Sequence, residues 1–406
     1  MSVTSVPVRP SHAPRVLILV YDDTTVFMGR AFVEECVARG LDYETALISC
    51  LDPRGPDPKR RRPHVSDRQL AMLTNVSARS TTVDDDHLAE HCLSFDVVLL
   101  TKLPPLAVRS LQRGLGRSRR PVLVGFSSGL DASPYQTLTN RAYVDLLLAN
   151  SPHHLRLLQS TGPVFWSDRP ALGVGHPFFA RRRHANLPIW SEVRDVFFLH
   201  QSVWPSLPDT RHAVCEFLVE LAERYPEKRI FLKLRHLPTE NKDNVNLELH
   251  APHEYFAARA KPLPPNLCID TSSFRETLGR SDLYLSVSSS GIVEGWVHGV
   301  PGLFVEGFPG ENHDALSRAI VDDFRSTGLV VSRDALLRGE LPVIAEAALA
   351  PHFCSVGYFD ELLARVEELR RGPVELARLH RLPLHLRIKK GLGEFVRRLA
   401  SNGRGI

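Results

Sequence analysis

The chain has 406 residues, which at roughly 100–200 residues per domain favours two domains. Its apolar share of 43% and charged share of 24% are those of an ordinary globular protein, so wholesale disorder is excluded. No stretch reaches the roughly 18 uninterrupted apolar residues of a membrane-spanning helix, and residues 1–14 lack the apolar core of a signal peptide. We therefore expect a cytoplasmic protein with a flexible leader at 1–14.

The formal net charge of +4 is unevenly distributed, because residues 370–406 hold ten Lys or Arg against two Glu. Apolar residues recur at spacings of three or four between Leu384 and Leu399, which predicts a basic amphipathic helix. Such a helix suits an anionic membrane surface, with packing onto the first domain as the alternative. Outside this tail the basic residues cluster only in short runs such as 59–62, so nucleic acid is not an expected partner.

Strand-like and helix-like segments alternate in the first half of the chain. The first strand is predicted at 15–21, where an unbroken apolar run is typical of a parallel sheet buried on both faces. A helix at 26–39 ends before Gly40, and a Pro-rich basic stretch at 52–68 indicates a long loop. Further strands are predicted at 43–49, 95–100, 121–126, 144–149 and 164–166.

The same alternation restarts after a polar, basic stretch at 181–188, which marks the expected domain boundary. Strands are predicted at 195–200, 229–235, 267–270, 282–287 and 301–305, and helices at 210–225, 274–279 and 290–298. Alternating β and α with right-handed crossovers predicts a doubly wound parallel sheet in each half. The expected fold is therefore α/β with two Rossmann-like domains, at 15–188 and 189–375, followed by a basic tail at 376–406.

Three hydroxyls and a glycine stand where a buried strand meets a helix: Ser288, Ser289, Ser290 and Gly291. Ligands of open α/β sheets bind at the carboxyl ends of strands, and a helix N-terminus offers free N–H groups to a phosphate. The glycine lets the backbone approach closely. Glu294 lies one turn further in, where it is placed to accept from ribose hydroxyls. The alternative is a serine that caps an ordinary helix.

Polar residues also follow the other strands of the second half. Lys233, Arg235 and His236 end one strand, which we expect to lie next to the serine-rich turn. Cationic groups there neutralise a phosphate and stabilise a leaving group, with His236 as a catalytic candidate. His200 and Gln201 end the first strand of this half and are candidates for the phosphate side. The alternative is a set of solvated strand ends.

Residues 195–310 resemble the nucleotide-binding half of GT-B glycosyltransferases, with a strand, a Ser-rich turn, a helix containing Glu, then Gly-Val-Pro and a strand. The non-hydrolysing UDP-N-acetylglucosamine 2-epimerases share this layout. Lys233–Pro238 is similar to the Lys-x-His-Pro element of sialyltransferase-like and CDP-glycerol glycerophosphotransferase-like enzymes, although Leu237 separates His from Pro here. In those families this element and a Ser-Ser pair hold the nucleotide phosphates. The resemblance implies a GT-B fold, with two domains facing across a cleft, in a family of bacterial glycosyltransferases.

The acceptor is expected to bind to the first domain. Asp22 and Asp23 end its first strand, and one of them is a candidate general base; the alternative is that Asp23 or Thr24 caps the next helix. Ser127 and Ser128 end another strand of that domain. In the second domain, two candidates for the sugar side follow a strand, Glu306 and Asn312.

No metal site is predicted, since the paired histidines lack both an HExxH motif and a clustered acidic set. GT-B transferases generally hold the phosphates with cationic side chains and helix ends, so no cofactor is expected either. No two of the six cysteines form a CxxC pair, which predicts buried, reduced thiols.

Together these features predict a glycosyltransferase. It would move a sugar or a polyol phosphate from a nucleotide-activated donor, CMP- or CDP-linked, to a hydroxyl of a cell-surface or capsular glycan or of a lipid-linked acceptor. Two alternatives stay open: a UDP-N-acetylglucosamine 2-epimerase-like enzyme, and a non-catalytic nucleotide-binding or scaffold protein.

Overall fold

The computed structural model describes residues 13–51, 61–77, 79–115, 120–127, 129–130, 133–161, 170–180, 186–237, 239–240, 248 and 250–371. The chain divides into two compact units, the first with the strands from Val16 to Phe126 and the second with those from Ala171 to Ser332. Several predicted features lie outside the described residues: the leader at 1–12, the loop at 52–60, Ser128, the strand at 164–166, the boundary residues 181–185, Pro238 and the tail at 376–406.

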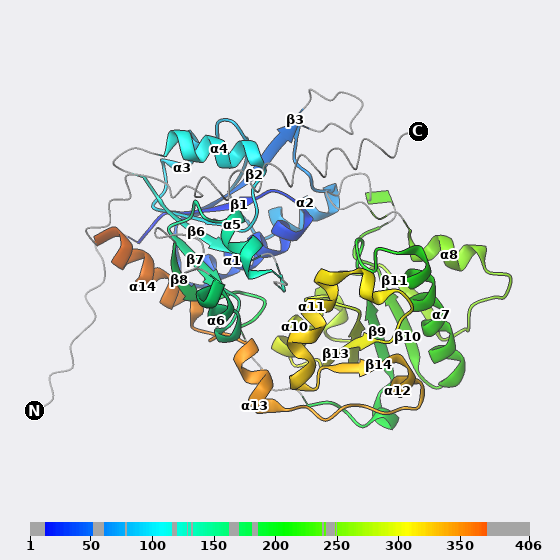
Figure 1. Cartoon of the computed structure of the whole chain (residues 1–406). Coiled ribbons are helices and arrows are strands. Elements are labelled where there is room, and N and C mark those ends of the chain that lie inside the picture. Colours follow the sequence, from blue (N-terminus) through cyan, green and yellow to red (C-terminus); the bar gives the residue numbers. More distant parts are fainter. Residues whose placement is uncertain are drawn as a thin grey trace, which may run out of the picture. The chain divides into compact units, whose positions relative to one another are not determined.

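The first sheet has these described strands: β1 (Val16–Val20), β2 (Tyr43–Leu51), β3 (Arg61–Arg62), β4 (Ser80–Asp84), β5 (Val97–Leu100), β6 (Val122–Phe126), β7 (Leu146–Ala149) and β8 (Ala171–Val174). Their order is β3-β2-β1-β5-β6-β7-β8, with β4 paired to β2 (Figure 1). β1 is parallel to both β2 and β5, whereas β3 is antiparallel to β2. The strand order therefore reverses between β1 and β5, whose carboxyl ends are neighbours.

Helices connect most of these strands: α1 (Asp23–Ala38), α2 (Asp67–Thr74), α3 (Leu88–Cys92), α4 (Pro105–Gly114), α5 (Pro134–Asn140) and α6 (Pro152–Thr161). All five residues of β1 are buried, as its unbroken apolar run requires in a sheet covered on both faces. A last helix, α14 (Tyr358–Arg371), also contacts this sheet, because Arg370 donates to the Asp96 carboxylate at 2.8 Å.

The second sheet consists of β9 (Asp195–Leu199), β10 (Arg229–Lys233), β11 (Leu267–Asp270), β12 (Leu283–Ser286), β13 (Gly302–Glu306) and β14 (Val330–Ser332). The strands run in the order β11-β10-β9-β12-β13-β14, and every neighbouring pair is parallel. This is the strand order of dinucleotide-binding folds. It reverses between β9 and β12, at the place where such sheets bind ligands.

The second sheet is accompanied by α7 (Pro208–Arg224), α8 (Pro252–Ala258), α9 (Phe274–Thr277), α10 (Gly291–His298), α11 (Ala315–Phe324), α12 (Arg333–Leu337) and α13 (Glu346–Leu349). Short 3-10 helices lie at η2 (Trp190–Glu192), η4 (Glu311–His313), η5 (Arg325–Thr327) and η6 (Ala350–His352). α7 packs on β10 and β11, whereas α10 packs on β12 and β13 (Figure 1). In the described part of the chain, no helix has the length and apolarity to cross a bilayer.

The structure corrects several sequence predictions. The loop predicted at 52–68 contains β3 and the first residues of α2. β4 escapes prediction because its Ser-Thr-Thr sequence has no apolar run, and β8 is a further strand that was not predicted. Cys268 is exposed, since it lies on the edge strand β11, whereas the other five cysteines are buried as expected.

Candidate functional site

The reversal point of the second sheet joins the ends of β9 and β12 through a serine. The Ser286 hydroxyl donates to the Leu199 carbonyl at 2.8 Å and accepts from the Ser289 backbone N–H at 3.2 Å. These bonds fold the chain after β12 back over the end of β9. The predicted serine-rich turn thus lies at the edge of the sheet where open α/β folds take their ligands.

Ser290 occupies the cap position of α10 without acting as a cap. Its backbone is already helical, with φ −60° and ψ −18°, and its side chain accepts no hydrogen bond from the helix. A capping serine has extended backbone angles and accepts from the second or third helical N–H. Ser290 is therefore not an ordinary cap, and its hydroxyl is available at the positive end of α10. The Ser289 hydroxyl instead accepts the Gly291 backbone N–H, at 3.2 Å.

Two glycines let α10 lie close to the sheet. A Cβ on Gly291 would stand 2.7 Å from Cδ1 of Leu199, and one on Gly295 would stand 2.6 Å from Cδ2 of Tyr284. Trp296 fixes the other side of the helix by donating its indole N–H to the Gly302 carbonyl at 2.9 Å. The helix N-terminus is held against the strand ends by close packing, in which a side chain at either position would have to displace a neighbour.

Glu294 lies in the first turn of α10 and is partly buried. Burial raises the pKa of its carboxyl to about 8, and the positive charge of Arg275 only partly opposes this. The group therefore keeps its proton near neutral pH, when it is able both to donate and to accept a hydrogen bond. That chemistry suits the predicted contact with a ribose diol.

The basic residues after β10 are directed mainly inwards. Lys233 is 7% exposed and donates to the Leu234 carbonyl, and His236 is 4% exposed with its Nε2 3.8 Å from Oε2 of Glu248. Arg235 is partly exposed. β9 lies between β10 and β12, so the prediction that this basic strand end adjoins the serine-rich turn is wrong. The roles of Lys233, Arg235 and His236 on the ligand stay predictions.

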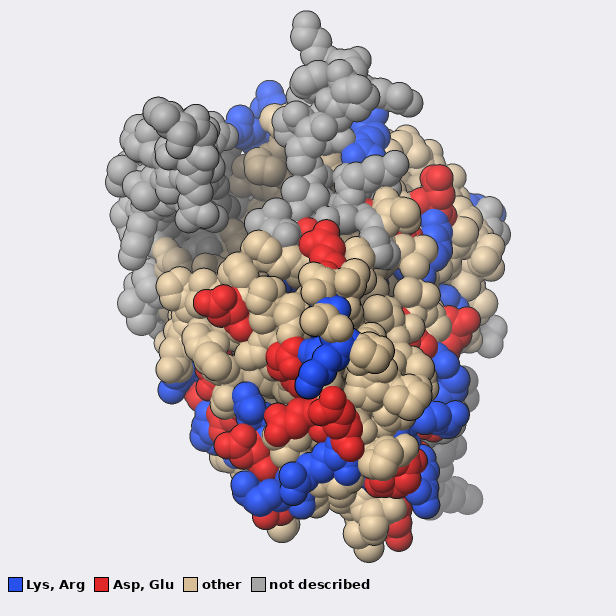
Figure 2. Space-filling model, turned by 90° about the vertical axis from the view of Figure 1, so that its right-hand side faces the viewer, with Lys and Arg blue, Asp and Glu red and all other residues tan. Residues whose placement is uncertain are grey.

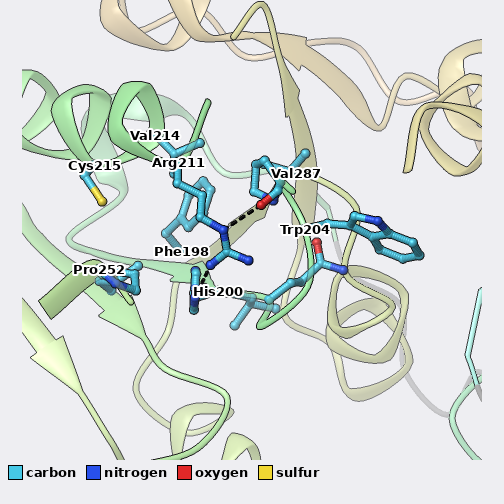
Figure 3. A pocket seen from close by; sticks show the side chains of 12 residues that line it. Phe198, His200, Trp204, Arg211, Val214, Cys215, Pro252 and Val287 are labelled. Carbon is cyan, nitrogen blue, oxygen red and sulfur yellow. Dashed lines mark hydrogen bonds between the residues drawn. The ribbon is translucent and has the colours of Figure 1, made fainter. Parts of the chain in front are cut away.

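His200 belongs to a buried ionic cluster under the strand ends, which the sequence prediction missed. Glu248 bonds to His200 Nε2 and accepts from Arg211 at 3.1 Å, and Arg211 also donates to the Ser202 and Pro205 carbonyls. The Arg211 guanidinium points toward the His200 ring (Figure 3). Burial lowers the pKa of His200 despite the Glu248 carboxylate. Burial acts to raise the pKa of Glu248, but the His200 hydrogen bond and the charges of His200 and Arg211 lower it overall. The cluster therefore ties His200 to the buried Arg211–Glu248 ion pair.

Two hollows border Arg211. One is too small to hold a nucleotide, and the other lies away from the serine-rich turn. The one in Figure 3 is about 10 Å³, hardly room for one water, between apolar side chains such as Phe198 and Val287. The other is about 490 Å³ and lies between α7 and α8, beside His212 and Tyr255. Its lining includes none of the serine-turn residues. The candidate site is accordingly the strand-end surface itself.

At the strand reversal of the first sheet, the Asp22 carboxylate is already hydrogen-bonded within the protein. Asp22 is fully buried, its Oδ1 accepts from the Thr25 N–H at 3.1 Å, and its Oδ2 accepts from Lys102 Nζ at 3.0 Å. Asp22 therefore caps α1, and the alternative that Asp23 or Thr24 caps it is wrong. Asp23 is the first residue of that helix.

Ser127, after β6, is likewise held by neighbours. Its hydroxyl donates to the Gly129 carbonyl at 3.2 Å, and its carbonyl lies 3.0 Å from His176 Nε2. Burial lowers the pKa of His176 to about 3, so the ring is neutral, and its Nδ1 accepts from the Phe178 N–H at 3.1 Å. These contacts give Ser127 a place in the scaffold of the first sheet.

The two sugar-side candidates after β13 have different surroundings. Glu306 accepts both Arg325 guanidinium hydrogen bonds, at 2.9 and 2.8 Å, so it is engaged in a bidentate pair. Asn312 is exposed on η4. Glu311 closes the intervening loop by accepting from the Gly307 and Phe308 N–H groups.

Among the described residues, one group of three potential metal ligands occurs at the end of β4: Asp84, Asp86 and His87. All three are exposed, and Arg61 donates to Asp86 at 2.9 Å. This is the arrangement of a surface ion-pair cluster.

Surface charge is mixed on the face of the molecule shown in Figure 2, where Lys and Arg side chains alternate with Asp and Glu. Arg338 and Glu340, 2.8 Å apart, form an exposed ion pair in the second unit. The described residues on this face therefore form no basic stripe of the kind that tracks a nucleic-acid backbone.

Comparison with known proteins adds a family and a fold. The family model described as "Putative glycosyltransferase (DUF6716)" matches residues 59–369. None of the curated proteins matches the sequence. The solved UDP complex of S. aureus MnaA is similar, with a TM-score of 0.53 and 10% identity over 88% of this chain and 96% of that one.

Two further structures show the same likeness. The UDP-GlcNAc 2-epimerase of Methanocaldococcus jannaschii has a TM-score of 0.51 and 11% identity over 87% of this chain and 99% of that one. Anabaena Alr3699/HepE in complex with UDP and glucose has a TM-score of 0.50 and 13% identity over 88% of this chain and 100% of that one.

At these identities the likeness concerns the fold alone, and it agrees with the two parallel Rossmann-like sheets described above. The expected GT-B-type fold is confirmed in its two Rossmann-like α/β sheets. Since the family model takes in most of the chain, including every strand of the second sheet, the chain belongs to the family of glycosyltransferases described as "Putative glycosyltransferase (DUF6716)".

Proposed function

We propose that the chain is a glycosyltransferase that holds a nucleotide-activated donor at the β9 and β12 strand ends and transfers its sugar to a hydroxyl of a glycan or lipid-linked acceptor. The observation that carries the proposal is Ser290, a serine at a helix N-cap whose hydroxyl caps nothing. It stands at the strand reversal of a dinucleotide-type sheet. Membership of a glycosyltransferase family supports the reaction class.

The chemistry of this turn matches a phosphate, which only accepts hydrogen bonds. The Ser290 hydroxyl, the N-terminus of α10 and the amide of Gln201 are donors or positive dipole ends. During transfer, negative charge grows on the departing nucleotide, and donors fixed in advance stabilise it without reorganising. The buried Lys233, at the end of β10, adds to the positive potential. Glu294 is the proposed ribose contact.

The donor base is the finer part of the proposal. We infer a cytidine donor, CMP- or CDP-linked, from the resemblance of Lys233–Pro238 to cytidine-using enzymes. The Lys233 side chain is turned into the protein, however, and two of the fold neighbours hold UDP. A uridine donor is therefore the alternative that the binding experiment must separate.

A second candidate function is epimerisation of a sugar nucleotide. The fold likeness to the M. jannaschii UDP-GlcNAc 2-epimerase favours it. Such an enzyme converts its substrate without an acceptor, whereas a transferase releases free nucleotide only when the sugar moves to an acceptor or to water.

The test is a thermal-shift panel with CMP, CDP, UMP, UDP, GDP and ADP on the wild type and Ser290→Ala. Ligand at about 100 times Kd stabilises by about 2.7 kcal/mol, or a few degrees in Tm. We expect a pyrimidine nucleotide to shift the wild type and to shift Ser290→Ala less. Ser273→Ala is the matched control, because Ser273 does cap its helix; it should lose stability and keep the shift. Silence from every nucleotide would contradict the proposal.

The reaction itself is then followed with CMP-, CDP- and UDP-linked sugars. Nucleotide release that rises on adding an acceptor glycan indicates transfer. Conversion of UDP-GlcNAc to its 2-epimer without an acceptor would instead establish the second candidate.

A further inference from the structure

A buried chain of hydrogen bonds runs from α11 to the end of β9 through the serine-rich turn. The Ser317 hydroxyl donates to the Ser288 hydroxyl at 2.7 Å. The Ser288 hydroxyl in turn donates to Oε1 of Gln201 at 3.0 Å, and the Ser288 backbone N–H donates to the same oxygen at 3.2 Å. Ser288 is 2% exposed and Ser317 is 3% exposed, so both are shielded from water.

The backbone N–H of Ser288 settles which way the Gln201 amide faces. A backbone N–H only donates, so the side-chain atom 3.2 Å from it must be the carbonyl oxygen and not the NH₂ group. The Ser288 hydroxyl fills the second lone pair of that oxygen. With its oxygen saturated on the buried side, Gln201 turns its two N–H donors away from Ser288, and the side chain remains partly exposed.

Ser317 makes the direction of the chain unambiguous. A hydroxyl has one hydrogen to donate and is able to accept at the same time. Because Ser317 donates to Ser288, the hydrogen of Ser288 is left for Gln201. Without Ser317, the Ser288 hydroxyl would lose the donor that fixes its rotation.

We propose that Ser288 and Ser317 are positioning residues that set the Gln201 amide as a pair of N–H donors for an anionic phosphate oxygen of the donor nucleotide. The inference rests on the proposed function and deepens it. It replaces the predicted direct contact of Ser288 with the phosphate, since the Ser288 hydroxyl is buried and already engaged on both sides. Ser290 and Gln201 then approach the phosphate from β12 and β9, the two strands at the reversal.

The direction of these hydrogen bonds determines which kind of ligand the site favours. A site that offers only donors favours an oxyanion and is indifferent to a neutral nucleoside. A carboxylate in place of the amide would keep the bonds from Ser288 and present an acceptor where the N–H donors stood. Gln201→Glu should therefore repel a diphosphate at nearly unchanged shape.

The test is calorimetric titration of the full-length chain with UDP, CDP, the matching nucleosides and inorganic pyrophosphate. Gln201→Glu should weaken diphosphate and pyrophosphate binding by about 30-fold or more, and leave nucleoside binding within about twofold. Ser317→Ala should weaken diphosphate binding by about three- to tenfold. Ser317→Thr keeps the hydroxyl and should restore it, which loss of packing alone would not do.

Two outcomes overturn the inference, and they differ from failure of the proposed function. If the wild type binds diphosphates and Gln201→Glu binds them equally well, the amide does not face the phosphate. If Ser317→Ala and Ser317→Thr lose diphosphate and nucleoside affinity alike, the serine only supports the fold. Absence of nucleotide binding in the wild type would instead contradict the proposed function, and this inference with it.

Discussion

Each of the two sheets has a point at which its strand order reverses, but the polar side chains at the two points differ in how fully they are hydrogen-bonded. At the first reversal, both oxygens of Asp22 are taken by donors of the same unit, from Thr25 and Lys102. At the second, Ser290 leaves its hydroxyl uncommitted and Gln201 turns its amide N–H groups away from its buried partners. In the first unit, the polar side chain at the reversal is therefore fully hydrogen-bonded within the protein. In the second unit, a similar strand arrangement leaves hydrogen-bond donors for a ligand. The difference lies in the side chains, not in the fold.

The largest expected effect is the loss of folding stability that the buried Glu294 carboxyl causes as pH rises. Glu294 has a pKa of about 8 in the folded protein against 4.5 in the unfolded chain, because burial disfavours the charged form. The unfolded chain releases this proton as pH rises above 4.5 while the folded protein retains it until about 8, so this contribution to stability is lost across that window. Glu294→Gln should remove that slope and gain roughly 4 kcal/mol in free energy of unfolding at pH 8.

Urea unfolding at a series of pH values measures this contribution. The control is Glu340→Gln, at an exposed glutamate outside the candidate site. If the free energy of unfolding depends on pH in the same way in Glu294→Gln and the wild type, the Glu294 carboxyl does not destabilise the fold.

Asp22→Ala tests the strand reversal of the first sheet, where the Asp22 carboxylate is already hydrogen-bonded. Loss of the cap and of the partner of Lys102 should lower the free energy of unfolding by roughly 2–3 kcal/mol. Nucleotide affinity should stay within about twofold, since Asp22 is occupied within its own unit. Asp22→Asn is the matched variant: it keeps a capping oxygen and should lose about 1 kcal/mol.

Asp22→Asn also decides the predicted role of Asp22 as a general base. A variant that loses only about 1 kcal/mol and keeps its nucleotide affinity, but transfers sugar at least about 100-fold more slowly, would make Asp22 a base as well as a cap. A cap alone predicts nearly unchanged turnover.

The smallest expected effect is at Ser290. Because its hydroxyl bonds nothing in the helix, Ser290→Ala should change the free energy of unfolding by less than about 0.5 kcal/mol. Nucleotide binding should weaken by about 1 kcal/mol, or roughly fivefold, for one lost hydrogen bond. Titration calorimetry and urea unfolding on one preparation give both values. A stability loss as large as that of a true cap, with unchanged binding, would erase the contrast between the two reversals.

The elements that build the site were predictable because their signals are local. Unbroken apolar runs mark β9 and β12, and Gly299, with φ 87°, ends α10 as a glycine after a helix is expected to do. Ser290 and Gly291 at the strand-to-helix junction follow from the same pattern. What is local in the chain could be placed from the sequence.

The side-chain partners could not be placed, because they depend on which strand ends become neighbours. Gln201 and Ser288 are 87 positions apart, and nothing in either segment indicates that an amide oxygen will meet a backbone N–H. The mistaken placement of Lys233–His236 beside the serine-rich turn has the same origin. Arg211 did leave a signal, since it is a cation on the buried face of α7, next to Val214 and Cys215. Glu248 left none.

Hydrogen–deuterium exchange with and without nucleotide tests most directly the claim that the second reversal binds the phosphate. With a saturating pyrimidine nucleotide, we expect slower exchange at 286–292, where the N-terminus of α10 meets the ligand, and no change at 21–26. Protection that appears at 21–26 and not at 286–292 would place the phosphate on the first sheet and contradict the account.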